Sequence, residues 1–405
     1  MLSDEVIEKV SERLVERIES LNLYILKKIA RSIKKIGKLT PSEAQQLIRM
    51  IEFGGDYDKI TNKIAEITEL NVKDIRKIFR DVAKENYVFT EQFYKYRNKK
   101  FIPFEENELL QRQVEAISNQ VVNNYIANTK VIGYSITDDK GNFLFQEVTN
   151  AYKETVDEAI LSISQGKTTF QEEMAKAMQK LGSSGLKYVD YSTGWTRRLD
   201  SSLAMNIRDG VSQLHNQNER LFGEQFGANG VEITVHSNPA PDHAEAQGRI
   251  FRYEEFDKFQ NDEDCEDVNG KKFPAEFEGR DRRSIGQYNC YHDIFPVIVE
   301  IKKPQFTDEQ LQEIIDRSKE EIEFEGKKYN RYELGQLQRK IERTIRKYKD
   351  LQIMGKESEN DKLMYRSQKK INQLVAKYYE LSKTSSLPTK LERLQVQGYK
   401  QVKLS

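Results

Sequence analysis

Residues 199–214 read LDSSLAMNIRDGVSQL, and residues 231–236 read VEITVH. Large apolar residues recur in the first stretch at steps of three and four, which predicts a helix with one apolar face. Apolar and polar residues alternate in the second stretch, which predicts a β-strand that ends at His236. The glycine-rich segment 222–230 lies between them. Helix, loop and strand together predict a compact α+β module of about 100 residues.

Helices are also predicted on the N-terminal side of this module. Apolar residues from Val6 to Ile36 share one helical stripe. Thr40-Pro-Ser-Glu43 has the cap residues of a second helix, which we expect to end at Gly54-Gly55, and residues 71–74 start another short helix. Two short runs within residues 132–151 surround a turn, which predicts a β-hairpin.

The C-terminal side begins with an acidic stretch, residues 254–281, which we interpret as a loop or irregular hairpin. Val297–Ile301 is predicted as a last buried strand. Thr307-Asp-Glu-Gln310 has the pattern of a capping box that opens the C-terminal helices. Apolar residues between Tyr332 and Tyr348 then recur at helical spacing.

These elements predict a predominantly helical α+β chain in four consecutive segments. They are a helical N-terminal region (1–130), a connector of hairpin plus helices (131–198), the central α+β module (199–303) and C-terminal amphipathic helices (304–405).

Composition agrees with a helical protein. The 405-residue chain is 37% hydrophobic and 32% charged, whereas soluble domains are on average about 45 to 50% apolar and about one quarter charged. Long helices with broad solvated faces fit these values. The formal net charge is zero, so no global field would attract nucleic acid or an anionic membrane. Neither a signal peptide nor a run of about 18 apolar residues occurs, and we expect assembly inside the cell.

Basic side chains gather on the polar face of the predicted C-terminal helix. They are Arg339, Lys340, Arg343, Arg346 and Lys347. Such a face would contact the phosphates of DNA, which a steep salt dependence would reveal. A contact with a protein partner and a simple solvated face fit the same pattern.

All four histidines and both cysteines lie between residues 215 and 292. His236, His243, Cys290 and His292 would supply three imidazoles and one thiolate, a ligand set suited to tetrahedral zinc. Their spacing is not that of a standard zinc finger. We expect His215 to be solvated or at a boundary, and Cys265 to be an exposed thiol.

Two other interpretations of this window remain open. The histidines would pin irregular turns by hydrogen bonds to the backbone, with Cys290 as a small buried apolar residue. Alternatively, Cys290 would be a nucleophile with His243 or His292 as its base and Asp242 or Asp293 as an orienting carboxylate. Only the distances between these side chains can decide among the interpretations.

An ordered series of short motifs runs through the same region. It comprises Tyr191-Ser-Thr-Gly194, Met205–Val211 with Asn206, Arg208 and Gly210, Pro241-Asp242-His243, Gln247-Gly248, and Asn289-Cys290-Tyr-His292 with Pro296. In order and spacing the series resembles the phage minor capsid protein 2 family. The segments 29–40 and 332–349 are similar to the family too, so the resemblance covers most of the chain. Ala240, Ala246 and Tyr291 stand where the family pattern has Arg, Trp and Arg.

The resemblance implies a non-enzymatic structural protein of the virion, present in several copies and assembled in the cytoplasm of a bacterial host. It implies a place at the portal vertex or head interior, a part in head morphogenesis, and a role in genome packaging or ejection. The implied partners are the portal protein, the major capsid protein and packaged DNA, without a membrane. In this setting the His and Cys residues form an architectural element that zinc would stabilise.

Two rival functions fit the sequence. One is a metal-dependent nuclease or toxin-like enzyme carried in the virion. The other is an internal head protein that contacts DNA through its basic C-terminal helix.

Overall fold

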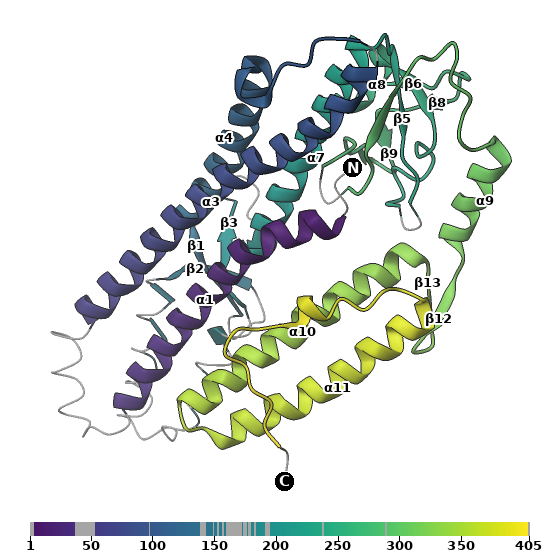
Figure 1. Ribbon diagram of the computed structural model, residues 1–405. Coiled ribbons are helices and arrows are strands. Elements are labelled where there is room, and N and C mark those ends of the chain that lie inside the picture. The colour runs from purple at the N-terminus through teal and green to yellow at the C-terminus, as the bar shows by residue number, and fades with distance from the viewer. Residues whose placement is uncertain are drawn as a thin grey trace. The chain divides into compact units, whose positions relative to one another are not determined.

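The computed structural model is predominantly helical, with short antiparallel strands (Figure 1). It describes residues 4–36, 53–96, 98–137, 143–148, 184–190, 195–236, 239–287 and 290–403, together with single positions between 150 and 181. The predicted α+β class with a helical majority is confirmed. Among the described helices, none is long and apolar enough to cross a membrane.

Helices account for most of the described chain. Their bounds are α1 Asp4–Ile36, α3 Phe53–Tyr96, α4 Glu108–Lys130, α7 Leu199–Gln225, α8 Tyr253–Gln260, α9 Asp308–Lys319, α10 Arg331–Glu357 and α11 Asp361–Ser385, with 3-10 turns η2 Phe104–Glu106 and η3 Leu391–Leu394. The helices predicted at 6–36, 199–214 and 332–348 correspond to α1, α7 and α10 and are confirmed. The predicted capping box is also present, because Thr307 accepts from Gln310 N at 3.3 Å while the Gln310 side chain accepts from Thr307 N at 2.9 Å.

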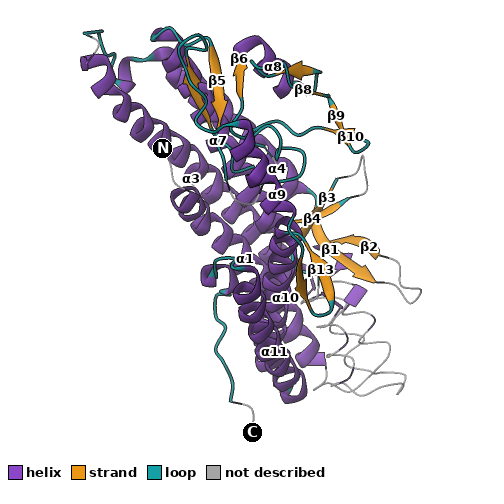
Figure 2. Ribbon diagram, turned by 90° about the vertical axis from the view of Figure 1, so that its right-hand side faces the viewer, coloured by secondary structure: helices purple, strands orange, loops and turns teal. Residues whose placement is uncertain are grey.

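The strands form small separate sheets (Figure 2). A four-stranded sheet of order β2-β1-β3-β4 contains β1 Ile132–Thr137, β2 Phe143–Glu147, β3 Lys187–Val189 and β4 Thr196–Arg198. A three-stranded sheet of order β11-β5-β6 contains β5 Gly230–Ile233, β6 Ile250–Arg252 and β11 Ile294–Val297. Two-stranded ladders join β7 Cys265–Glu266 to β8 Lys272–Phe273, β9 Glu276–Phe277 to β10 Arg280–Asp281, and β12 Ile322–Phe324 to β13 Lys327–Tyr329.

Three predictions about strands can be compared with these sheets. The hairpin predicted within 132–151 is confirmed by the antiparallel pairing of β1 with β2. The acidic stretch 254–281 contains the expected hairpin, β7 with β8, but it also contains α8, which was not predicted. The strand predicted at Val297–Ile301 is wrong: β11 pairs with β5 and ends at Val297, because residues 299–301 form a turn closed by Ile301 N to Ile298 O at 3.1 Å.

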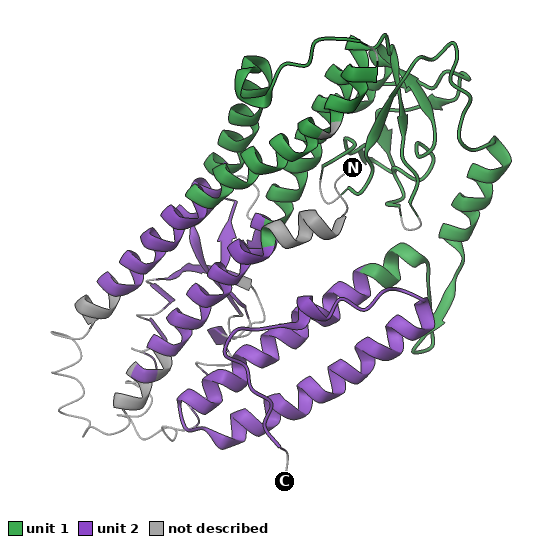
Figure 3. Ribbon diagram, viewed as in Figure 1, with its two compact units in different colours: residues 1–11, 73–123, 204–335 green, residues 12–72, 124–203, 336–405 purple. Residues whose placement is uncertain are grey.

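Two compact units make up the chain, each built from three separate stretches (Figure 3). Unit 1 contains residues 1–11, 73–123 and 204–335, and unit 2 contains residues 12–72, 124–203 and 336–405. The helices α1, α3, α4, α7 and α10 carry residues of both units. The four consecutive segments expected from the sequence do not correspond one to one to these units, and they stay a prediction.

The interior of α3 differs from the prediction around Asn71. This helix begins at Phe53 and continues to Tyr96, so Gly54-Gly55 does not end a helix and residues 71–74 do not start one. Asn71 is fully buried, accepts from Arg17 Nη1 at 3.1 Å and donates to Tyr125 Oη at 3.0 Å. Its amide is satisfied by distant side chains, so it has no need to cap a helix. The helix start predicted at Thr40 lies outside the described residues.

A buried charged network lies in unit 2. Arg198 donates from Nη2 to Asp200 Oδ2 at 2.9 Å, and Arg346 donates from Nη1 to Glu19 Oε1 at 2.6 Å and to Asp200 Oδ2 at 3.3 Å. Asp350 is buried beside this network, and among the described residues its carboxylate accepts a long contact of 3.5 Å from Asn22 Nδ2. Asp200 accepts from two guanidinium groups and also from Ser201 N at 2.7 Å, whereas the hydrogen bond described for Asp350 comes from a neutral amide. The ionised form is therefore better stabilised at Asp200 than at Asp350.

Candidate metal centre

The predicted His and Cys residues lie at the edge of the core of unit 1. This core consists of buried residues from β5, β6, α8, β7, β8, β11 and the turns between them, namely Val231, Ile233, Ala246, Phe251, Phe256, Phe259, Cys265, Phe273, Ile285 and Ile294. Cys290 packs against it and is half-buried, while the side chains of His243 and His292 are buried. The apolar core therefore excludes water from one side of the cluster.

Backbone hydrogen bonds bring two distant loops together at this point. His243 lies in a series of turns that follows β5, and Gly248 N donates to Ile233 O at 2.8 Å, which returns the chain to the sheet. His292 lies two residues before the start of β11, whose register places Ile294 opposite Ile233. Thr234 N donates to Asp293 O at 3.0 Å and extends that pairing to the residue beside His292. The antiparallel ladder therefore positions both loops.

Three of the four predicted metal ligands converge. The Sγ atom of Cys290 lies 3.3 Å from Nδ1 of His243 and 3.3 Å from Nδ1 of His292. One ligand atom from each residue lies within 4.8 Å of the other two. Imidazole nitrogen and thiolate sulfur are both ligands of zinc in proteins. His243, Cys290 and His292 are thus placed to hold a metal ion.

The outer nitrogens of both imidazoles are bonded to amide oxygens. His243 Nε2 lies 2.7 Å from the backbone oxygen of Arg283, and His292 Nε2 lies 3.4 Å from Gln247 Oε1. A carbonyl oxygen only accepts hydrogen bonds, so each Nε2 carries the proton and each Nδ1 directs a lone pair toward Cys290. Gln247 was predicted as a motif residue, and it also accepts from His236 N at 3.2 Å.

His236 lies next to the three converging residues but is not one of them. Its ring centre is 4.1 Å from that of His292, with an angle of 43° between the ring planes. His236 also lines a pocket of about 440 Å³ together with Val235, Ile314, Arg317, Glu320 and Arg331. The predicted four-residue group is therefore a three-residue cluster with the fourth imidazole beside it.

Burial sets the protonation of the cluster. Desolvation holds the pKa of His243 and His292 below the ordinary histidine value and lowers the pKa of His236 to about 4. Desolvation also raises the pKa of the Cys290 thiol to about 11. The imidazoles are therefore neutral at pH 7, which is the form that binds metal ions, and the thiol is protonated unless a cation displaces its proton.

The ion pair of Arg283 with Asp242 was not predicted. Arg283 Nε donates to Asp242 Oδ2 at 2.7 Å, and Arg283 N donates to the same oxygen at 3.4 Å. This pair holds the backbone carbonyl that receives the proton of His243. Nothing in the spacing of Arg283 marks it in the sequence, because its partner is 41 residues away.

Several predicted motif residues have packing roles. A Cβ at Gly210 would come 2.7 Å from Phe79 Cζ, so glycine allows a close approach inside unit 1. Gly248 has a φ of +71° and faces Leu311. The Arg208 guanidinium lies 5.1 Å from the centre of the Tyr291 ring. Asn206, Pro241 and Pro296 are half-buried or exposed, and Asn289 lies outside the described residues.

Two predictions about exposure are wrong. His215, expected to be solvated or at a boundary, is 7% exposed, and Cys265, expected to be an exposed thiol, is 5% exposed. Cys265 lies in β7, where the β7–β8 hairpin directs its side chain into the core. The acidic residues around it gave no sign of this, because alternate residues of a strand face opposite sides.

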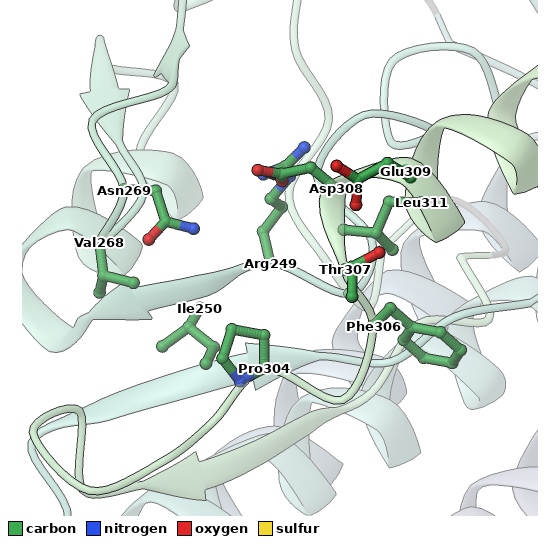
Figure 4. Close-up of a pocket in the computed structure, with 11 residues that line it drawn as sticks. Arg249, Ile250, Val268, Asn269, Pro304, Phe306, Thr307, Asp308, Glu309 and Leu311 are labelled. Carbon is green, nitrogen blue, oxygen red and sulfur yellow. Dashed lines mark hydrogen bonds and ion pairs between the residues drawn. The ribbon is translucent and has the colours of Figure 1, made fainter.

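A second pocket of unit 1, of about 270 Å³, lies between β6 and the start of α9 (Figure 4). Arg249 points into it, yet its Nη1 already lies 2.5 Å from Asp308 Oδ1 and 3.4 Å from Asp267 Oδ2. Because two carboxylates neutralise this guanidinium, the pocket offers no free charge for an anionic ligand.

Comparison with protein families agrees with the motif series. The sequence profile described as phage minor capsid protein 2 matches residues 2–381. The chain belongs to the phage minor capsid protein 2 family. This minor capsid protein is therefore a structural component of the virion. No curated protein and no solved structure is significantly similar to it.

Proposed function

We propose that this minor capsid protein is a portal-associated component of the phage head that acts in head morphogenesis and genome packaging. Family membership supports the setting, and an exposed apolar segment supports a protein contact. Within the last turns of α3, Val88 is 47%, Phe93 43% and Tyr96 86% exposed. Contiguous exposed apolar patches mark protein-binding surfaces, and we propose that these three side chains belong to one. We place the contact with the portal protein on this segment.

The exposed segment is held by a rigid aromatic base in unit 1. Tyr94 contacts the rings of Phe101 and Phe226, with ring centres 5.4 and 5.3 Å apart. Phe222 and Phe226 contact each other at 4.7 Å. A docking surface that is already ordered loses little conformational entropy on binding.

Co-purification with the portal protein of the same phage tests the proposal. We expect a complex, and we expect the double variant Val88→Ala/Tyr96→Ala to weaken it at least tenfold. The double variant Tyr365→Ala/Tyr379→Ala is a matched control, because it removes aromatic side chains that are 39% and 47% exposed on α11. Absence of any complex between the unmodified protein and the portal protein would disprove portal association.

A second proposal is that α10 contacts packaged DNA. Lys340 and Arg343 are exposed, and Arg339 and Lys347 are half-buried. Arg346 is occupied by Glu19 and Asp200, so the usable basic face is smaller than the sequence predicts. DNA affinity should fall steeply between low and physiological salt and fall further in Lys340→Ala/Arg343→Ala. A DNA affinity that does not change with salt concentration would exclude this contact.

We also propose that the protein is not an enzyme. In a Cys–His hydrolase a carboxylate commonly orients the imidazole and the thiol ionises readily. Here amide oxygens orient His243 and His292, and burial raises the pKa of Cys290. Incubation with DNA and divalent metal ions should leave the DNA intact. Cleavage that His243→Ala abolishes would establish the nuclease alternative instead.

A further inference from the structure

We propose that His243, Cys290 and His292 bind one zinc ion through their Nδ1, Sγ and Nδ1 atoms. The site would cross-link the loop after β5 to the loop before β11. This inference is independent of portal binding, since it rests on the geometry of unit 1 alone.

The distances match those around a tetrahedral ion. With Zn–S of about 2.3 Å and Zn–N of about 2.0 Å, a sulfur and a nitrogen on one tetrahedral zinc lie about 3.5 Å apart. Both Sγ–Nδ1 distances here are 3.3 Å. Two imidazoles on such an ion have ring centres about 5 Å apart, and those of His243 and His292 are 5.5 Å apart. The three ligand atoms lie within 4.8 Å of one another, so the two imidazoles would close in on the ion as it binds.

The positions of the protons on the three side chains also favour a bound metal ion. Both Nδ1 atoms direct lone pairs at Cys290, because both Nε2 protons are used by Arg283 O and Gln247 Oε1. One thiol proton can serve only one of these two nitrogens. At the other Nδ1 atom, the nitrogen lone pair would then face the sulfur lone pairs in a buried site, which is repulsive. A zinc ion resolves this, because it accepts both lone pairs and the thiolate while the thiol proton passes to water.

The surroundings have the form of an outer ligand shell. Metal-bound imidazoles usually donate their other N–H group to a carbonyl or carboxylate, which fixes the ring orientation. His243 does so to a backbone oxygen at 2.7 Å. The thiolate and imidazole donors favour zinc over magnesium or calcium, which prefer oxygen ligands.

We assign the fourth position to His236. Its ring centre is 4.1 Å from that of His292, about 1 Å closer than the separation on a shared tetrahedral ion. A side-chain rotation would bring it into the first shell. The adjoining pocket, which His236 lines, provides the path by which the ion would enter.

Metal analysis of the full chain, purified with zinc and dialysed, tests the site. We expect about one zinc per chain, less than one tenth of that in Cys290→Ser, and an unchanged content in Cys265→Ser. His236→Ala should retain zinc but release it to a chelator at least tenfold faster. A folded unmodified protein without zinc, or equal loss in both cysteine variants, would overturn the proposal.

A second measurement avoids variants that fail to fold. In the Cys265→Ser protein, Cys290 is the remaining cysteine. Its reaction with a thiol reagent should slow at least tenfold on adding zinc and recover on chelation. Cobalt should give a thiolate-to-metal charge-transfer absorption in the same protein. An unaltered reaction rate, or cobalt without that absorption, would rule out Cys290 as a ligand.

Discussion

Nε2 of His243 lies 2.7 Å from the backbone oxygen of Arg283. The same arginine forms an ion pair with Asp242, the residue directly before His243. The two loops are therefore joined twice, once through an imidazole and once through a guanidinium. Removing the Arg283 guanidinium should therefore make the His243 imidazole less well positioned, although His243 itself remains in place.

Arg283→Ala should weaken zinc binding about tenfold, because residues that orient metal ligands typically affect metal affinity by about 10- to 100-fold. Competition against a chromophoric chelator measures the effect. Arg280→Ala removes an exposed arginine of β10 and serves as the control. Equal affinities of the two variants would show that the pair with Asp242 does not position His243.

Asp350→Asn should stabilise the protein at pH 8. Burial raises the pKa of Asp350 from 3.8 to about 7, with opposing effects of Arg198 and Arg346 and reinforcing effects of Glu19 and Asp200. Between these values the folded state holds a proton that the unfolded state releases, so this stabilisation is present below about pH 4 and is lost as pH rises toward 7. Asparagine stays neutral at every pH. We expect a gain of about 1 to 3 kcal/mol at pH 8.

Denaturant unfolding at pH 5 and pH 8 checks this prediction. One proton contributes a slope of about 1.4 kcal/mol per pH unit, which the variant should lack between about pH 4 and 7. A variant less stable than the unmodified protein at pH 8 would mean that the Asp350 carboxylate is ionised and usefully paired.

Asp200→Asn should destabilise the protein, which is the opposite of the effect expected for Asp350→Asn. The side chain of Asp200 is 2% exposed and accepts from Arg198 and Arg346, which hold the pKa of its carboxyl below the ordinary value. Such a group stabilises the fold above its unfolded pKa and loses that contribution as pH falls. Removing its charge takes the ion-pair partner from the buried Arg198 guanidinium and one of two carboxylates from Arg346, and should cost about 3 kcal/mol at pH 7. Denaturant unfolding of both variants under the same conditions compares their free energies of unfolding. An Asp200→Asn variant as stable as the unmodified protein would contradict the prediction.

Gly210→Ala should destabilise unit 1. A Cβ would lie 2.7 Å from Phe79 Cζ and 2.9 Å from Val121 Cγ2, closer than carbon atoms can pack. Overpacking typically costs about 1 to 3 kcal/mol, and the helix propensity of alanine returns at most about 1 kcal/mol. We expect a net loss of about 1 kcal/mol or more, measured by thermal unfolding. Gln217→Ala at an exposed position of α7 should change stability little, and a stabilised Gly210→Ala would contradict the close packing.

Local patterns were sufficient wherever the interactions are local. The apolar stripe of α1 predicts Leu14, Ile18, Leu21 and Ile25, each at most 2% exposed. The capping box at Thr307 needs only a partner three residues away. Asn71 was misread as a helix start because its partners, Arg17 and Tyr125, are 54 residues away on either side.

The sequence by itself determined the helical majority, the β5 strand before His236, the family and the short list of metal-ligand candidates. Those features depend on periodicity and motif order, which are readable along the chain. Only the tertiary structure decided that His243, Cys290 and His292 converge while His236 stays beside them, and that Arg346 is used for ion pairs. Sγ and Nδ1 of Cys290 and His243 belong to residues 47 positions apart, so their distance depends on strand register and core packing.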